Sequence, residues 1–283
     1  MSKFFNQTVK ARNLSAPAES IKAAAVDDYQ AAAAAPKPVA VELPANPLQD
    51  CRRLANPISG ILEAQFHGSP TMDSVRESYR GLRTRLLKLQ SARNLRSILV
   101  TSAAQADGKT MTSLNLALCC AQLHDTKVLL IDGDIRSRGL SRAFGSCEGY
   151  GLADVLAGEC APEKAILATE LPNLYVMHSG LPSGPPAELL ASKKWQELMA
   201  WCGENFKIVL VDSPPVLDLT DVELLSAACD GVLMVVRAQR TKRATLEKSV
   251  GRIDAKKLLG VVFNAVGGAS PKDNYLYYGA KES

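Results

Sequence analysis

The stretch SILVTSAAQADGKT, residues 97–110, decides the fold. Its first half, SILVTS, has the composition and length of a buried strand, and the residues that follow it have the spacing of an amphipathic helix. Gly108, Lys109 and Thr110 therefore stand where a strand passes into a helix N-terminus. Unpaired backbone N–H groups and the helix dipole favour an anion at such a place. The stretch predicts a site for a nucleotide phosphate; the alternative is an ordinary strand-to-helix turn that contains Gly-Lys-Thr.

Carboxylates follow two other apolar runs. KVLLIDGDIR carries Asp132 and Asp134 at the end of its run, and FKIVLVDSPP carries Asp212. A carboxylate at the end of a buried strand is costly unless it faces a cation or a hydrogen-bond network. Lys109 would neutralise phosphate oxygens, and Thr110 would offer its hydroxyl to Mg²⁺. The three strand ends together predict an ATP·Mg²⁺ site.

Short apolar runs alternate with helical patterns over most of the chain. The expected strands are 96–101, 127–132, 174–178, 207–212, 231–236 and 259–264; the expected helices begin near 72 and cover about 109–123, 151–157, 187–203, 218–228 and 241–255. This alternation predicts an α/β fold, doubly wound, with a mainly parallel sheet and helices on both faces. Ligands of such sheets bind beyond the carboxyl ends of the strands.

Length and composition bound the rest of the chain. With 283 residues, 47% of them hydrophobic, it can bury one sizeable core and still have tails. We expect a disordered Ala/Pro-rich leader over residues 1–70, a P-loop ATP-binding domain over 71–268 and a flexible tail over 269–283. A net charge of +4 is too even a balance for a nucleic-acid partner.

Cysteine usage and hydropathy predict the compartment. The seven cysteines form no CxxC pair, which is typical of thiols in a reducing cytosol. We find no signal peptide, and the longest apolar runs are too short to span a bilayer. The sequence therefore predicts a cytoplasmic protein, in which any membrane association must come through a partner.

Together the GKT loop, DGDIR and VDSPP resemble the bacterial tyrosine kinases of capsular and exopolysaccharide synthesis, which are related to the MinD/ParA ATPases. In that family these are the Walker A, Walker A′ and Walker B motifs, and the resemblance covers about residues 70–280. It implies an ATP-dependent protein-tyrosine kinase with a P-loop NTPase fold.

The resemblance also implies roles for residues. The nucleotide would contact Ala106, Asp107, Gly108, Lys109, Thr110, Met111 and Asn264; the last is otherwise a turn residue. Thr110, Asp132 and Asp212 would organise Mg²⁺ directly or through water. The catalytic group would be Lys109, Asp132, Asp134 and Arg136. Asp134 would orient or deprotonate the phenol, unless Asp132 has that role, and Arg136 would balance the carboxylates or touch the acceptor.

The phosphate loop departs from its relatives at three positions. MinD/ParA ATPases carry a further lysine where this chain has Ala104, which favours the kinase branch. The kinase branch usually has Pro-Gly where this chain has Gln105 and Ala106. If the backbone at Ala106 needs a positive φ, alanine costs about 1 kcal/mol there.

Two further features fit the kinase branch. Tyr275, Tyr277 and Tyr278 cluster near the C-terminus, where the family carries tyrosines that a neighbouring subunit phosphorylates; an aromatic patch docked on the domain is the alternative. Glu77, Arg80 and Arg83 form ExxRxxR on one broad helix face, which in the family holds subunits in a ring. In isolation such charges usually form a solvated face.

The resemblance thus implies autophosphorylation of the tail in trans, which controls polysaccharide polymerisation and export. The implied partners are further copies of the chain, a membrane polysaccharide co-polymerase as adaptor, and a cognate tyrosine phosphatase. Two other functions stay open: a MinD/ParA-like ATPase switch, and a nucleotide-binding scaffold that has lost catalysis.

Overall fold

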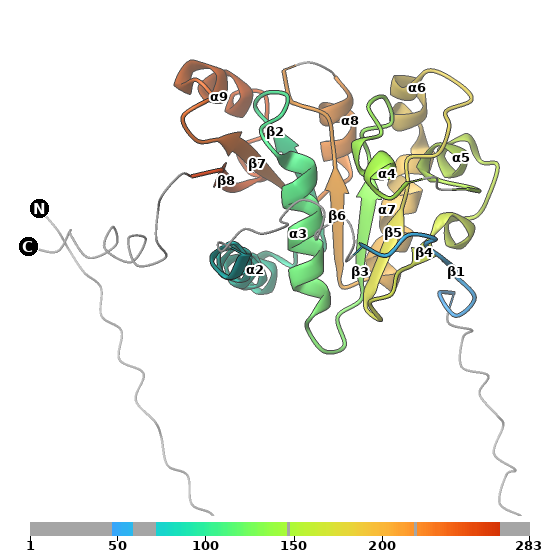
Figure 1. Cartoon of the computed structure of the whole chain (residues 1–283). Helices are drawn as coiled ribbons and strands as arrows, with labels where there is room; N and C mark the ends of the chain where they lie inside the picture. The colour runs from blue at the N-terminus through green and yellow to red at the C-terminus, as the bar shows by residue number, and fades with distance from the viewer. Residues whose placement is uncertain (1–46, 59–71, 146–147, 218–219, 267–283) are drawn as a thin grey trace, which may run out of the picture. The chain divides into compact units, whose positions relative to one another are not determined.

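The structure is a computed structural model, and it describes residues 47–58, 72–145, 148–217 and 220–266. These residues build one eight-stranded sheet with the order β1-β4-β5-β3-β6-β2-β7-β8 (Figure 1). The strands are β1 Arg52–Arg53, β2 Ser97–Ser102, β3 Val128–Asp132, β4 Leu167–Ala168, β5 Leu174–Met177, β6 Ile208–Asp212, β7 Gly231–Arg237 and β8 Leu258–Asn264. All neighbours are parallel except β4 and β5.

Helices cover both faces of this sheet. They are α2 Met72–Arg93, α3 Lys109–Ala121, α4 Gly139–Ala143, α5 Leu152–Ala157, α6 Pro186–Ala191, α7 Lys193–Asn205, α8 Asp221–Ala227 and α9 Arg243–Val250, with a 3₁₀ helix, η1, at Pro162–Ala165. Figure 1 shows α2, α3 and α4 in front of the sheet and α7 and α8 behind it. The predicted doubly wound α/β fold is therefore confirmed.

Alternating side chains on the central strands build a separate hydrophobic core on each face. Leu129 and Ile131 of β3 pack in one core, with residues of α5, α7 and α8. Val128 and Leu130 pack in the other, with residues of α2, α3 and α4. Side chains two residues apart on a strand share a face, so Asp132 continues the row of Val128 and Leu130 toward the α3 side.

The six strands expected from the sequence are present, each within two residues of its predicted ends. The helix predicted at 187–203 is instead two helices, because Ser192 between α6 and α7 has an extended backbone. The sequence did not predict β1, β4, α4 or η1. These elements have only two to five residues, too few to show a period.

One part of the predicted leader is built into the fold. Arg52–Arg53 pairs with Leu167–Ala168 at the edge of the sheet, and the side chains of Leu48 and Ile58 are buried in the two cores. Residues 47–58 therefore depart from the predicted disorder, because strand pairing and apolar burial hold them. The rest of the leader and the whole tail lie outside the described residues, so the domain boundaries stay a prediction.

Candidate active site

The phosphate loop is shaped by two residues with a positive φ, Ala106 and Gly108. Gly108 has a φ of 95° and directly precedes α3. Ala106 has a φ of 61°, the positive value for which alanine is unfavourable. The buried carboxylate of Asp107 holds the loop on both sides, because it accepts from the Ala104 N–H at 2.9 Å and from the Thr241 hydroxyl at 2.7 Å.

Asn264, at the end of β8, lies against this loop. Its side-chain amide donates to the Asp107 carbonyl oxygen at 2.9 Å. A Cβ atom added to Gly108 would collide with that amide. The loop therefore requires glycine at position 108 for its φ and for the close approach of Asn264.

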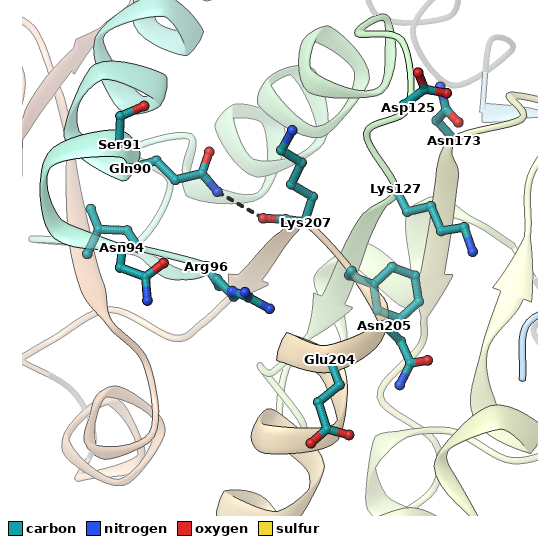
Figure 2. A pocket seen from close by; sticks show the side chains of 12 residues that line it. Gln90, Ser91, Asn94, Arg96, Asp125, Lys127, Asn173, Glu204, Asn205 and Lys207 are labelled. Carbon is teal, nitrogen blue, oxygen red and sulfur yellow. Dashed lines mark hydrogen bonds between the residues drawn. The ribbon is translucent and has the colours of Figure 1, made fainter. Parts of the chain in front are cut away.

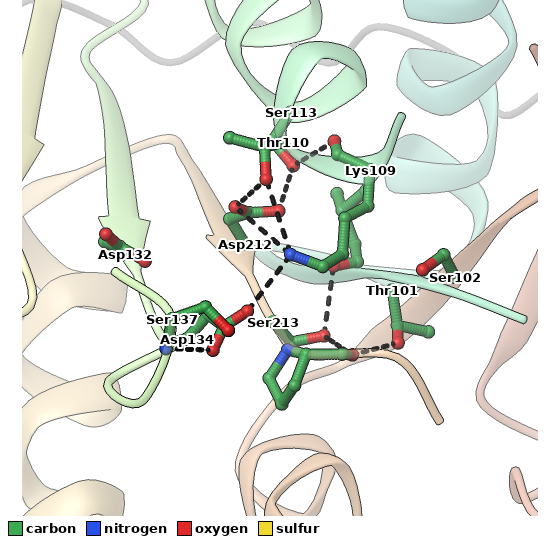
Figure 3. A network of polar contacts seen from close by, with 12 residues as sticks. Thr101, Ser102, Lys109, Thr110, Ser113, Asp132, Asp134, Ser137, Asp212 and Ser213 are labelled. Atoms are coloured by element: carbon green, nitrogen blue, oxygen red, sulfur yellow. Dashed lines mark hydrogen bonds and ion pairs between the residues drawn. The ribbon is translucent and has the colours of Figure 1, made fainter. Parts of the chain in front are cut away.

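Lys109 joins two of the predicted aspartates. Its ammonium lies 3.2 Å from a carboxylate oxygen of Asp134 and 3.9 Å from one of Asp212 (Figure 3). Asp212 also accepts from the Thr110 hydroxyl at 2.7 Å and from the Ser113 hydroxyl at 3.2 Å. Residues from the loop after β3, from the end of β6 and from the start of α3 thus meet at one point.

Asp132 and Asp212 are direct neighbours in the register of β3 and β6. Paired residues of parallel strands point to the same face, about 4.8 Å apart. Asp132 has one oxygen, Oδ2, bound by the backbone N–H of Ser141 at 2.7 Å and by its hydroxyl at 2.6 Å. The other oxygen, Oδ1, is buried and has no hydrogen-bond partner among the described residues.

Burial gives these carboxylates unusual proton affinities. It raises the pKa of Asp212 to about 7, although the Lys109 ammonium opposes the shift. Burial also raises the pKa of Asp132, and the bonds from Ser141 oppose that shift. Even with Lys109 nearby, charging both groups is therefore unfavourable unless a further cation binds, as expected for ligands of a metal ion.

Comparison with known proteins gives the family. The AAA domain family profile matches residues 96–256. Tyrosine-protein kinase YwqD of Bacillus subtilis (strain 168) is 34% identical over 209 residues, which are 73% of this chain and 87% of YwqD. The chain belongs to the bacterial tyrosine-protein kinase family.

Solved structures agree with this assignment. The kinase domain of the Escherichia coli tyrosine kinase ETK superposes with a TM-score of 0.67 at 29% identity, over 79% of this chain and 86% of that one. The septum site-determining protein MinD complexed with Mg-ADP, from Pyrococcus horikoshii OT3, has a TM-score of 0.50 at 22% identity and covers 63% of this chain and 75% of its own. The likeness to MinD shows the shared fold. The predictions of a protein-tyrosine kinase and of a nucleotide-binding P-loop fold are confirmed.

Arg136 of this kinase forms an ion pair with an aspartate of α8. Its guanidinium forms two hydrogen bonds with Asp221 at the start of α8, at 2.8 and 3.2 Å. These bonds raise the pKa of Arg136. Asp221 is buried, and its role could not be predicted from the sequence because a carboxylate in the first turn of a helix is common for other reasons.

The three residues of the ExxRxxR motif on α2 do not share one environment. Glu77 and Arg80 form an exposed ion pair at 3.3 Å. Arg83 instead turns inward and donates to the carbonyl oxygen of Cys119 in α3 at 2.7 Å. The prediction that all three face a neighbouring subunit stays a prediction, but Arg83 also has a contact within its own chain.

Met111 and the three tail tyrosines are the remaining predicted residues. Met111 lies on α3 and packs against the core formed with α2, α3 and α4. Tyr275, Tyr277 and Tyr278 lie outside the described residues. Within the described ranges, no helix has the length and apolarity needed to cross a bilayer.

Proposed function

We propose that this kinase transfers the γ-phosphoryl group of ATP to Tyr275, Tyr277 or Tyr278 of a neighbouring copy, and that this reaction regulates capsular or exopolysaccharide polymerisation and export. The observation that carries the proposal is the position of the Lys109 ammonium between Asp134 and Asp212, at the N-terminus of α3. Such a site can bind a phosphate group and a metal ion next to a carboxylate that accepts a proton.

Phosphate binding would fall to the loop and to Lys109. The backbone N–H groups from Ala106 to Met111 surround the start of α3, where the helix dipole favours an anion. Lys109 has only 14% of its side chain exposed, so its charge is weakly screened by solvent. Asn264 would act by holding the loop, and contact of Asn264 with the purine base is a further part of the proposal.

Thr110, Asp132 and Asp212 fit a magnesium ion. All three offer oxygen atoms, which Mg²⁺ prefers, and Oδ1 of Asp132 is a buried oxygen without a partner among the described residues. MinD, which shares the fold, was solved with Mg-ADP. When bound, Mg²⁺ would neutralise charge on the phosphate oxygens.

Asp134 is suited to receive the phenol proton. It is buried beside Lys109, and the backbone N–H of Ser137 holds its other oxygen at 3.0 Å. In the proposed step the tyrosine oxygen bonds to the γ-phosphorus, the bond from that phosphorus to the bridging oxygen of ADP breaks, and the phenol proton passes to Asp134. Arg136 would support this reaction through its ion pair with α8.

The proposed partners are those that the resemblance to the family implies. We propose a ring of copies that brings one tail to the next active site, with Glu77 and Arg80 exposed for that contact. A membrane co-polymerase would act as adaptor at the inner face of the membrane, and a cognate phosphatase would remove the phosphate groups.

Incubation of the full chain with Mg·ATP, with and without the cytosolic segment of an adaptor, tests the proposal. We expect phosphotyrosine on tail peptides by mass spectrometry and none with Lys109→Met, because that variant lacks the ammonium. Mixing Lys109→Met with a chain whose three tail tyrosines are phenylalanine distinguishes transfer within one chain from transfer between two chains. Modified tails of the Lys109→Met chain mean transfer in trans.

Two other results would replace the proposal. Release of phosphate without phosphotyrosine would indicate an ATPase switch. Normal Mg·ATP binding without either reaction, even with the adaptor, would indicate a scaffold.

A further inference from the structure

The two oxygens of Asp132 have different surroundings. Oδ2 accepts both the backbone N–H and the hydroxyl of Ser141, at 2.7 and 2.6 Å. Oδ1 has no partner among the described residues, although the residue is fully buried. Asp212, its neighbour in the sheet, differs, since Thr110 and Ser113 occupy both of its oxygens.

Ser141 is itself held in one orientation. Its hydroxyl oxygen accepts the backbone N–H of Ser179 at 2.9 Å and lies 3.0 Å from the Ser179 hydroxyl. The Ser179 hydroxyl in turn accepts from Nε of Arg138 at 3.2 Å. Both serines are almost completely buried. The Ser141 hydroxyl thus accepts from the Ser179 backbone and donates its single proton to Asp132.

A carboxylate fixed by one oxygen cannot rotate to satisfy the other. Two donors on Oδ2 therefore determine the direction of Oδ1, and no polar group of the described residues bonds to it. A buried acceptor without a partner is costly, and a cation would remove that cost. Groups behind a metal ligand commonly orient it in this way.

We propose that Ser141 is a positioning residue that fixes Asp132 so that Oδ1 faces the metal ion of the bound nucleotide, with Ser179 and Arg138 fixing Ser141 in turn. The inference rests on the proposed function, because it takes Asp132 as a metal ligand. It adds a residue of α4, outside the three motifs that the sequence analysis used.

The test separates metal binding from nucleotide binding. A fluorescent ADP carrying an N-methylanthraniloyl group is bound to the full chain in EDTA, and MgCl₂ is then titrated. Ser141→Ala keeps the backbone donor and loses the hydroxyl. We expect the Mg²⁺ concentration at half-effect to rise about tenfold, as for other groups that orient a metal ligand. Affinity for the fluorescent ADP in EDTA should stay unchanged.

Two variants serve as controls. Ser141→Thr keeps a hydroxyl, and we expect it to keep the Mg²⁺ response of the wild type. Ser249→Ala removes an equally buried hydroxyl that donates to the Thr245 carbonyl in α9, far along the chain from the site. It should leave the Mg²⁺ response unchanged.

Three results would overturn the inference. The first is an unchanged Mg²⁺ response in Ser141→Ala, and the second is an equal loss of nucleotide affinity in EDTA, which would mean that Ser141 only supports the fold. The third applies if Ser141→Ala does not fold: a weakened Mg²⁺ response in a folded Ser141→Thr, which keeps the hydroxyl, would also overturn the inference. A wild type without any response to Mg²⁺ would be different, because it would also remove the metal from the proposed function.

Discussion

Asn264, the last residue of β8, donates its side-chain amide to the backbone carbonyl of Asp107 in the phosphate loop, 2.9 Å away. The two residues are 157 positions apart, so the loop depends on a strand at the edge of the sheet that is distant in the sequence. Nucleotide binding is therefore sensitive to residues that need not touch the nucleotide.

Asn264→Ala should weaken binding of ATP and of inorganic tripolyphosphate alike. The lost hydrogen bond holds the loop and is worth about 1 kcal/mol, or about fivefold in affinity. Calorimetric titration measures both ligands. Asn205→Ala, which removes an amide that donates to the Trp201 carbonyl, is the control. Weaker ATP binding with unchanged tripolyphosphate binding would mean instead that Asn264 contacts the purine.

Ala106→Gly should be tolerated. Glycine removes the strain of a φ of 61°, and this gain of about 1 kcal/mol offsets its larger entropy loss on folding. The same change at Ala200, exposed in the middle of α7, should cost about 1 kcal/mol. Urea denaturation gives both values. An equal loss of stability at the two positions would contradict the argument from φ.

Arg136→Ala should lower the free energy of unfolding by about 1–2 kcal/mol, because it leaves the buried Asp221 carboxylate without its partner. The value is below that of a fully buried pair, since Arg136 has 41% of its side chain exposed. In Asp221→Asn the same arginine change should cost less. A double-mutant cycle in urea measures the difference, and additive losses would show that the pair contributes nothing.

Arg80→Ala and Arg83→Ala should separate assembly from stability. Arg80 is exposed, so its loss should change stability by less than about 0.5 kcal/mol while self-association weakens. Arg83 binds the Cys119 carbonyl, so its loss should cost about 1–2 kcal/mol. Sedimentation and urea denaturation give the two quantities. Equal effects of both changes on stability would contradict the inward position of Arg83.

His178 should make the fold sensitive to acid. Burial lowers the pKa of His178 from 6.5, with Arg138 and Arg52 adding to the shift and Asp154 opposing it. Below about pH 6.5 His178 is protonated in the unfolded chain but not in the folded chain, so the free energy of unfolding decreases as the pH is lowered. His178→Gln should lose less stability than the wild type between about pH 7.5 and about pH 5. Urea denaturation at each pH measures the free energy of unfolding. An equal loss of stability in the two proteins over this pH range would contradict the prediction.

The convergence of Lys109, Asp134 and Asp212 could be predicted from the sequence. Each follows an apolar run, and the carboxyl ends of parallel strands meet at one edge of the sheet. The positive φ of Ala106 was also anticipated as a condition, from the glycine that the kinase branch usually has there.

The partners of these residues could not be predicted. Ser141 lies on a five-residue helix without a period, and its bond to Asp132 depends on how the chain turns after β3. Arg83 has the sequence context of a surface residue, and only the packing of α2 on α3 reveals its bond to Cys119. Such contacts follow from tertiary packing, which the residue pattern of a short segment does not indicate.

The ammonium of Lys109 already has two anionic neighbours before any ligand arrives. An incoming triphosphate must therefore compete for a cation that is in use, and the carboxylates released by the exchange need a new counter-charge. Affinity for nucleotide is then a small difference between two well-compensated states. A divalent ion that enters together with the triphosphate restores neutrality on the carboxylate side, so that each is expected to bind more tightly in the presence of the other.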